Sequence, residues 1–265
     1  LVYPITNVLV LLYQAFTSVG LPYALGFAII GLTLIMRLIL YPLTASQLKM
    51  SKKMQDIAPH INALKEKHKN DPKRLQSETM QLYATHGVNP LAGCLPLILQ
   101  MVVLFALYAA LNEISKDPQL VLKHINSLVY FDWMRLDKVW DTTFFGLPLT
   151  KKPSELLGVV GFSILLIPIV TGLLQFVQSA MMFSKPHEKK EKKTKDQAVD
   201  FAQAMQTNTL YILPVMIGYF SFTFPLALAL YWNTFTVFGI IQQYKLTGPG
   251  RLAEWKERFL PGTKK

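Results

Sequence analysis

Long apolar blocks separated by polar segments dominate the pattern along the chain, and five of them are long enough to suggest membrane spans. Each approaches the ~20 residues that an α-helix needs to cross ~30 Å of hydrocarbon. Pro168 interrupts the third block, and Pro225 follows the fourth so closely that a tight helical hairpin is predicted there. The predicted spans are residues 21–43, 90–112, 156–183, 207–223 and 225–244. The pattern therefore predicts an all-α polytopic membrane protein with five transmembrane helices.

Residues 1–20 are also apolar, but polar side chains such as Asn7 and Gln14 interleave with the apolar ones until Gly20 and Pro22 end the pattern. Amphipathic helices of this kind are typical of segments that lie in the membrane interface. We therefore predict an N-terminal interfacial helix. A sixth span is the alternative that the sequence leaves open.

The polar segment 44–89 has the pattern of a helical hairpin. Asp71 is a good N-cap, Pro72 suits the first helical position, and Gly87 suits the end of the second helix. Apolar side chains recur at helical spacing in the first half, between Lys and Glu residues, at Ile57, Ile61 and Leu64. These signals predict two capped amphipathic helices rather than a linker.

Basic residues are concentrated on one side of the predicted bundle. Segment 44–89, the charged loop 184–206 and the tail 245–265 together have a net charge of +10, whereas segment 113–155 is neutral overall. The positive-inside rule places the three basic segments in the cytoplasm and the N-terminus outside. Such a face fits either anionic lipid or a polyanion such as ribosomal RNA. The extracytoplasmic segment 113–155 is rich in aromatic residues, which is typical of an interfacial belt.

The composition excludes several classes of protein. Hydrophobic residues make up 51% of the chain and charged residues only 16%, whereas soluble globular proteins contain roughly 25% charged residues. So few charges cannot cover the surface of a soluble protein, and so much apolar sequence is incompatible with a disordered chain. Cys94 is the only cysteine, which excludes a disulfide scaffold.

Arg37 is the only basic residue within a predicted span, and no Asp or Glu lies in any of the spans. An arginine at the centre of a helix costs roughly 2.5–3.5 kcal/mol on insertion scales. It therefore either snorkels to the cytoplasmic end of its helix or lies in a water-filled cavity. Polar side chains on several spans favour a shared hydrophilic groove, with a predicted lining of Arg37, Thr33, Gln100, Thr171, Gln175, Gln178, Trp232, Asn233, Thr236 and Gln243.

Enzymatic chemistry finds little support. Every histidine lies outside the predicted spans, and the HExxH zinc motif is missing. The stretch 161–165 begins like a GxSxG nucleophile motif but continues with Ile164 and Leu165. The intramembrane carboxylates of aspartyl proteases and of ion-coupled transporters are missing as well. We expect a protein that is not an enzyme and needs no metal or cofactor.

Several blocks of the sequence resemble the YidC family of membrane protein insertases. The blocks include the arginine stretch 34–44 (LIMRLILYPLT), the hairpin 54–76 and the stretch 82–101 (LYATHGVNPLAGCLPLILQM). Two later stretches match as well, 167–182 (IPIVTGLLQFVQSAMM) and 224–232 (FPLALALYW) with Gln242 and Gln243 after it. Two positions depart from the pattern. Thr236 stands where the family often has Asn, and Ala227 replaces a turn glycine.

The resemblance implies a five-span bundle with a groove that opens to cytoplasm and lipid. By matched position Arg37 is the groove arginine, and Gln100 and Trp232 are groove residues. The implied function is insertion and folding of nascent membrane proteins at the cell inner (plasma) membrane, with the arginine attracting acidic substrate flanks. The expected partners are nascent membrane proteins, the ribosome through the basic tail and loops, the Sec translocon and anionic lipids. The alternative function is a solute channel or transporter that uses the same polar cleft.

Overall fold

A computed structural model describes most of the chain, and its regular structure is almost entirely helical. The predicted charged loop 184–206 lies outside the described residues, as do most of the predicted second span and the last twelve residues of the tail. The described residues are 2–69, 71–88, 100–101, 103–109, 118–182 and 208–253.

The chain divides into two compact units. The first unit comprises Leu1–Leu40, Leu97–Leu174 and Val215–Phe238. The second unit comprises Tyr41–Pro96, Gln175–Pro214 and Gly239–Lys265. Several helices contribute one part to each unit, so the units do not correspond to successive stretches of sequence.

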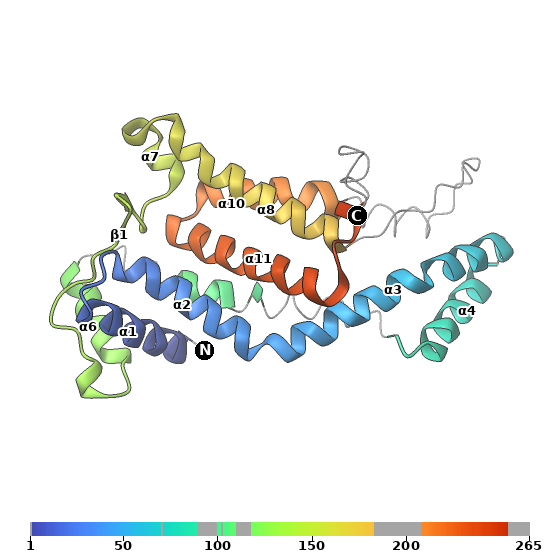
Figure 1. Cartoon of the computed structure of the whole chain (residues 1–265), viewed down its shortest axis with the longest axis horizontal. Helices are drawn as coiled ribbons and strands as arrows, with labels where there is room; N and C mark the ends of the chain where they lie inside the picture. The colour runs from blue at the N-terminus through green and yellow to red at the C-terminus, as the bar shows by residue number, and fades with distance from the viewer. Residues whose placement is uncertain are drawn as a thin grey trace, which may run out of the picture. The chain divides into compact units, whose positions relative to one another are not determined.

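The apolar core of the first unit is built around α1 (Val2–Ser18) and α2 (Ala24–Ile39), which pack against each other (Figure 1). Leu9 of α1 and Leu25 and Ile29 of α2 are fully buried. A helix break falls within the predicted span 21–43, because α2 stops at Ile39 and a new helix begins at Tyr41. Pro42 is the physical reason, since it lacks the N–H that would bond to the carbonyl four residues earlier.

The predicted extracytoplasmic segment folds onto this core. It contains α6 (Pro118–Leu128), the 3₁₀ turn η2 (Asp132–Met134), and the antiparallel strands β1 (Thr143–Phe144) and β2 (Leu147–Pro148). Phe145 and Gly146 both have positive φ, as a tight two-residue hairpin turn requires. The Phe144 ring lies where a side chain on Gly26 of α2 would be, so glycine at 26 lets the hairpin pack on the helix.

Polar residues of α1 attach the helix to this segment. The Asn7 side chain accepts a hydrogen bond from the Tyr130 amide (2.7 Å) and donates one to the Leu128 carbonyl (2.8 Å). Gln14 donates to the Met134 carbonyl at 2.9 Å. Asn7 is buried, so it satisfies backbone groups rather than facing water. The polar positions that predicted an interfacial helix therefore have a tertiary role, and the helix's place in the membrane stays a prediction.

Replacing Asn7 with alanine is expected to lower the free energy of unfolding by about 1–3 kcal/mol, because two backbone groups of the segment lose their partner. Amide hydrogen exchange on the detergent-solubilised protein should become faster at residues 128–130. Thr17→Ala is the matched control, since the exposed Thr17 hydroxyl bonds only to its own helix, at the Tyr13 carbonyl. Equal effects of the two substitutions would contradict the attachment.

The break in the predicted third span lies at Gly161 rather than at Pro168. α7 (Pro153–Val160) ends at Gly161, whose φ is 79°, and the short 3₁₀ turn η3 (Phe162–Leu165) leads into α8 (Leu166–Met182). Pro168 lies in the first turn of α8, where a helix does not need the backbone N–H. Gly161 is a better chain breaker here because it adopts a positive φ without strain.

Two consecutive helices, separated by residues 224–225, occupy the place of the last two predicted spans. The fourth begins with the π-helical turn η4 (Asn208–Ile212) and continues as α10 (Leu213–Thr223), and α11 runs from Leu226 to Thr247. Within the first unit α10 and α8 approach each other closely at Gly218. A Cβ atom at this position would stand 3.2 Å from the Pro168 carbonyl oxygen. Backbone carbonyls of Leu149 and Lys151 accept from the first amides of α11 and so cap that helix.

The second unit contains the helical hairpin predicted for 44–89. Its helices are α3 (Tyr41–Lys67) and α4 (Pro72–Thr85), which fold back against each other (Figure 1). The Asp71 side chain accepts from the Arg74 amide at 3.0 Å, which confirms the predicted N-cap. Gly87 has a φ of +61°, as the predicted helix stop requires. The first helix of the hairpin, α3, starts at Tyr41, a few residues before the predicted segment 44–89.

Among the described residues, one helical stretch, Phe162–Met182, is long and apolar enough by itself to cross a membrane. The pair Ala24–Ile39 and Tyr41–Lys67 meets the same criterion only when taken together as one broken span. α11 is 22 residues long, but its Asn and Gln residues lower its mean hydropathy. The helical fold is therefore confirmed, whereas the number of five spans stays a prediction.

Candidate substrate-binding site

Arg37 lies in the last turn of α2 and is buried, with 5% of its surface exposed. Its guanidinium carbon stands 3.3 Å from the centroid of the Phe235 ring and 5.7 Å from that of Phe238, both on α11. One terminal nitrogen donates a hydrogen bond of 2.6 Å to the Phe235 carbonyl. The Nε atom is buried and finds no partner among the described residues. The cation therefore ends on a neighbouring helix rather than extending into solvent.

A second polar contact joins α11 to the predicted second span. Gln100 is buried and donates a hydrogen bond of 3.0 Å to the Tyr231 hydroxyl, which is buried as well. The Tyr231 ring lies 6.0 Å from the Phe235 ring, one turn along α11. Gln100 and Arg37 thus contact the same stretch of α11.

The other groove residues predicted in the first unit are buried or half-buried. Thr33 donates to the Ile29 carbonyl of its own helix at 2.6 Å. Thr171 lies 3.1 Å from the Ser221 hydroxyl and so joins α8 to α10. The Thr236 hydroxyl and the Asn233 carbonyl oxygen are buried atoms without a hydrogen-bond partner in the described part of the chain. Trp232 is half-buried.

The remaining three predicted residues, Gln175, Gln178 and Gln243, belong to the second unit. Gln175 and Gln243 are buried, and Gln178 is half-buried. Gln243 lines a small pocket with residues of α3 and with Met181 and Met182 at the end of α8.

Further polar contacts in the second unit are made by residues outside the predicted groove lining. Gln242 donates to the Thr44 hydroxyl at 2.8 Å, and Gln55 donates to the Met182 carbonyl. The Gln47 amide is buried and has no partner in the residues that the structure describes.

The predicted groove lining includes Trp232 but not three other aromatic residues of α11, which contact Arg37 or Gln100. Tyr231, Phe235 and Phe238 read as ordinary apolar positions of a span, so hydropathy alone gave no reason to select them. Their spacing of four and three residues does place them along one face of α11, a signal that gains meaning only once Arg37 is known to lie there.

This arrangement can bind an anion. The positive charge of Arg37 is not neutralised by its described contacts, which are an aromatic ring and a carbonyl rather than an anion. An unpaired Nε–H in a buried setting is a strong donor to a carboxylate.

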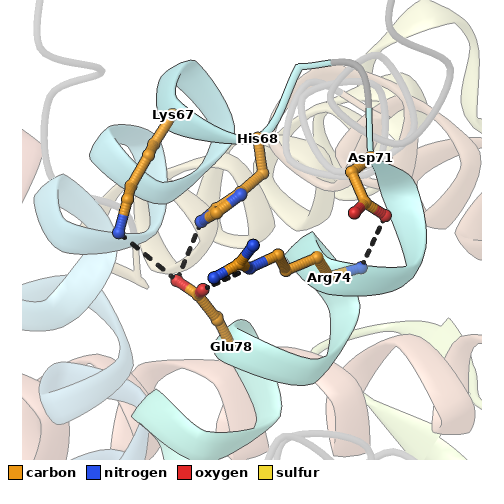
Figure 2. Close-up of polar contacts among 5 residues, drawn as sticks. All are labelled: Lys67, His68, Asp71, Arg74 and Glu78. Carbon is orange, nitrogen blue, oxygen red and sulfur yellow. Dashed lines mark hydrogen bonds and ion pairs between the residues drawn. The ribbon is translucent and has the colours of Figure 1, made fainter.

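The apex of the α3–α4 hairpin holds a compact cluster of charges, shown in Figure 2. Glu78 of α4 accepts from the buried His68 side chain at 2.9 Å and from Arg74 at 3.3 Å. Lys67 lies 4.0 Å from the same carboxylate. Partial desolvation raises the pKa of Glu78, but the hydrogen bonds from His68 and Arg74 and the nearby cations outweigh this effect. The net result is a pKa below the ordinary value of 4.5.

Because folding lowers the pKa of Glu78, its contribution to hairpin stability is present above the unfolded pKa and is lost as the pH falls through the folded one. We expect protection of the α4 amides, corrected for intrinsic exchange rates, to fall when the pH drops below about 4.5. Glu78→Gln should reduce this pH dependence, whereas Glu66→Gln, at an exposed position of the same hairpin, should keep it. A similar pH profile for both variants would contradict the role of Glu78.

Comparison with known proteins identifies the family. Residues 15–250 match the family described as 60Kd inner membrane protein. A membrane protein insertase YidC of Oceanobacillus iheyensis is 35% identical over 84% of this chain and 75% of its own length. Membrane protein insertase YidC 1 of Halalkalibacterium halodurans is 33% identical over 94% of this chain and 77% of its own. The chloroplastic inner membrane protein ALBINO3 of Arabidopsis thaliana is 31% identical over 90% and 50%.

The family match covers the hairpin, Arg37 and α11, which are the elements from which the resemblance was predicted. It confirms that resemblance, together with the prediction of an insertase rather than an enzyme. The chain belongs to the 60Kd inner membrane protein family, that of the YidC-type membrane protein insertases.

Proposed function

We propose that this insertase accepts nascent membrane proteins in a hydrophilic groove, where Arg37 acts as a counter-charge for acidic substrate flanks. The observation that supports this role is a buried guanidinium whose described partners are uncharged. The proposed groove is lined by Arg37 and the nine other polar residues predicted from the sequence, and it opens to cytoplasm and lipid.

The physical task is to bring a short polar flank across hydrocarbon beside an apolar segment. A wet groove within the bilayer shortens the dry path, and Arg37 attracts the flank more strongly there than in water because the local dielectric is lower. The apolar segment then leaves sideways into lipid, and lipid solvation of its side chains drives release. None of these steps requires a nucleotide or a cofactor.

The proposed topology has five spans, with the N-terminus outside and the C-terminus in the cytoplasm of a cell inner (plasma) membrane. The net charge of +10 on three segments against zero on segment 113–155 supports this orientation. A cysteine introduced at an exposed position of α4, in a chain with Cys94 replaced by serine, should resist an impermeant maleimide in intact cells and react after permeabilisation. Labelling of that cysteine in intact cells would contradict this orientation and indicate the opposite one.

The same charge distribution supports further partners. The basic tail and loops fit the ribosome or anionic lipids, and contact with the Sec translocon follows from the resemblance. Ribosome co-sedimentation that is unaffected by salt and by removal of the tail would count against the ribosome contact.

A reconstituted assay separates an insertase from a solute channel or transporter. Proteoliposomes that contain only this protein should insert a single-span substrate with an acidic flank, as measured by protease protection, and should not release an entrapped small solute. Solute flux without insertion would favour the channel or transporter instead.

A further inference from the structure

We propose that Phe235 is the positioning residue for Arg37: its ring and its carbonyl hold the guanidinium while leaving the positive charge available to a substrate carboxylate. This inference rests on the proposed counter-charge role of Arg37. It concerns a residue that the polar pattern of the sequence did not select.

One residue makes both contacts with the guanidinium. The ring centroid of Phe235 lies 3.3 Å from the guanidinium carbon, and the Phe235 carbonyl accepts a hydrogen bond of 2.6 Å from the same group. A ring contact and a donor–acceptor contact together restrict both the position and the tilt of a planar cation. Phe238 is farther away, at 5.7 Å, and its carbonyl makes no hydrogen bond to Arg37 in the structure as described.

The chemical character of these contacts matters as much as their geometry. A carboxylate partner would hold Arg37 equally well, but it would neutralise the charge and occupy the donors that a substrate needs. An aromatic face attracts a cation through its quadrupole and carries no net charge. Phe235 can therefore stabilise a buried arginine between substrates and still leave the Nε–H unpaired.

The Phe235 ring also has an aromatic neighbour. Tyr231 lies one turn earlier on α11 with its ring 6.0 Å away, and its hydroxyl accepts a hydrogen bond from Gln100. A continuous series of contacts thus runs from the predicted second span through α11 to α2, by way of Gln100, Tyr231, Phe235 and Arg37. This series explains how a ring at position 235 can be held firmly enough to orient a cation.

The test compares matched substitutions on the same helix. Phe235→Leu removes the ring face and keeps an apolar side chain and the backbone carbonyl, whereas Phe238→Leu makes the same change at the more distant ring. Phe235→Tyr keeps the ring as a conservative variant.

Each variant is reconstituted in proteoliposomes, with Arg37→Ala for reference. Insertion is measured for one substrate with an acidic flank and for the same substrate with that flank neutralised. We expect Phe235→Leu to reduce insertion of the acidic substrate by about fivefold to twentyfold, with wild-type insertion of the neutral one.

A spectroscopic readout tests the contact independently of insertion. Protons of a guanidinium above an aromatic face are shielded by the ring current, so NMR of ¹⁵N-arginine-labelled protein in bilayers should show an upfield Arg37 signal, assigned by its loss in Arg37→Ala. This shift should disappear in Phe235→Leu and persist in Phe238→Leu and Phe235→Tyr.

The outcomes separate this inference from the function on which it rests. An unshifted Arg37 signal in the wild type, or equal insertion defects in Phe235→Leu and Phe238→Leu, would overturn the positioning role. Equal loss of acidic and neutral substrates in Phe235→Leu would overturn it too, because that result indicates general packing. If Arg37→Ala itself inserts both substrates equally, the counter-charge function fails, and the functional role of Phe235 fails with it even where the ring-current shift is present.

Discussion

Insertion of a substrate with an acidic flank is expected to fall by about ten- to a hundredfold when Arg37 is replaced by alanine. A hydrogen bond to a charged group contributes about 1.5–3 kcal/mol, and each 1.4 kcal/mol corresponds to a factor of ten. The same substrate with its flanking Asp or Glu neutralised should lose much less, because only the charge attraction has been removed. The measurement is protease protection of both substrates in proteoliposomes.

Other substitutions at the same position define what the arginine supplies. Lysine should restore part of the activity, since it keeps the charge but loses the planar group that lies on the Phe235 ring. Glutamate should be worse than alanine for the acidic substrate because like charges repel. Equal defects of Arg37→Ala with and without the acidic flank would reject charge pairing and leave groove hydration as the role of Arg37.

Removal of the outer part of the α3–α4 hairpin is expected to reduce insertion by about tenfold while the bundle stays folded. We propose that the hairpin receives the nascent substrate, and a receiving element on the same chain as the groove raises the effective concentration of substrate there. The cut should spare the inner part of α3, where Thr44 bonds to Gln242 and Gln55 bonds to Met182.

The structure indicates where to cut. The rings of His60 and His86 lie 6.1 Å apart, so residues 61–85 can be replaced by a short Gly-Ser linker without straining the inner turns. A second variant carries a Gly-Ser segment of the original length. It separates the effect of losing the two helices from the effect of shortening the loop. Circular dichroism and thermal unfolding report on the bundle. Full insertion by a stably folded short variant would show that the hairpin is dispensable.

The α1 helix shows where pattern reasoning reached its limit. Asn7 and Gln14 were correctly recognised as exceptions in an apolar segment, and exposure to an interface was the simplest explanation. Their partners lie about 120 residues later, at Leu128 and Met134. Only a folded chain reveals such partners, because a polar side chain on an apolar helix has the same pattern whether it faces headgroups or caps a distant backbone.

The helical class, the family and the candidate polar residues of the groove could all be predicted from the sequence. Each of these depends on local information: runs of apolar residues, the Asp71 cap with Pro72 after it, and ordered motif blocks. The same information located Arg37 and showed that no acidic residue of a span could pair with it.

The contacts that hold Arg37 could not be predicted from local patterns, because Phe235, whose carbonyl accepts its hydrogen bond, is 198 positions away in the chain. The positions at which helices break also depend on the folded structure. The pattern favoured Pro168, yet the helix breaks at Gly161, because a proline in a first turn costs nothing whereas a positive φ favours glycine. Periodicity specifies which residues share a face of a helix. It does not specify which distant helix packs against that face. In this protein α11 places an aromatic ring, rather than a carboxylate, against the buried arginine of α2.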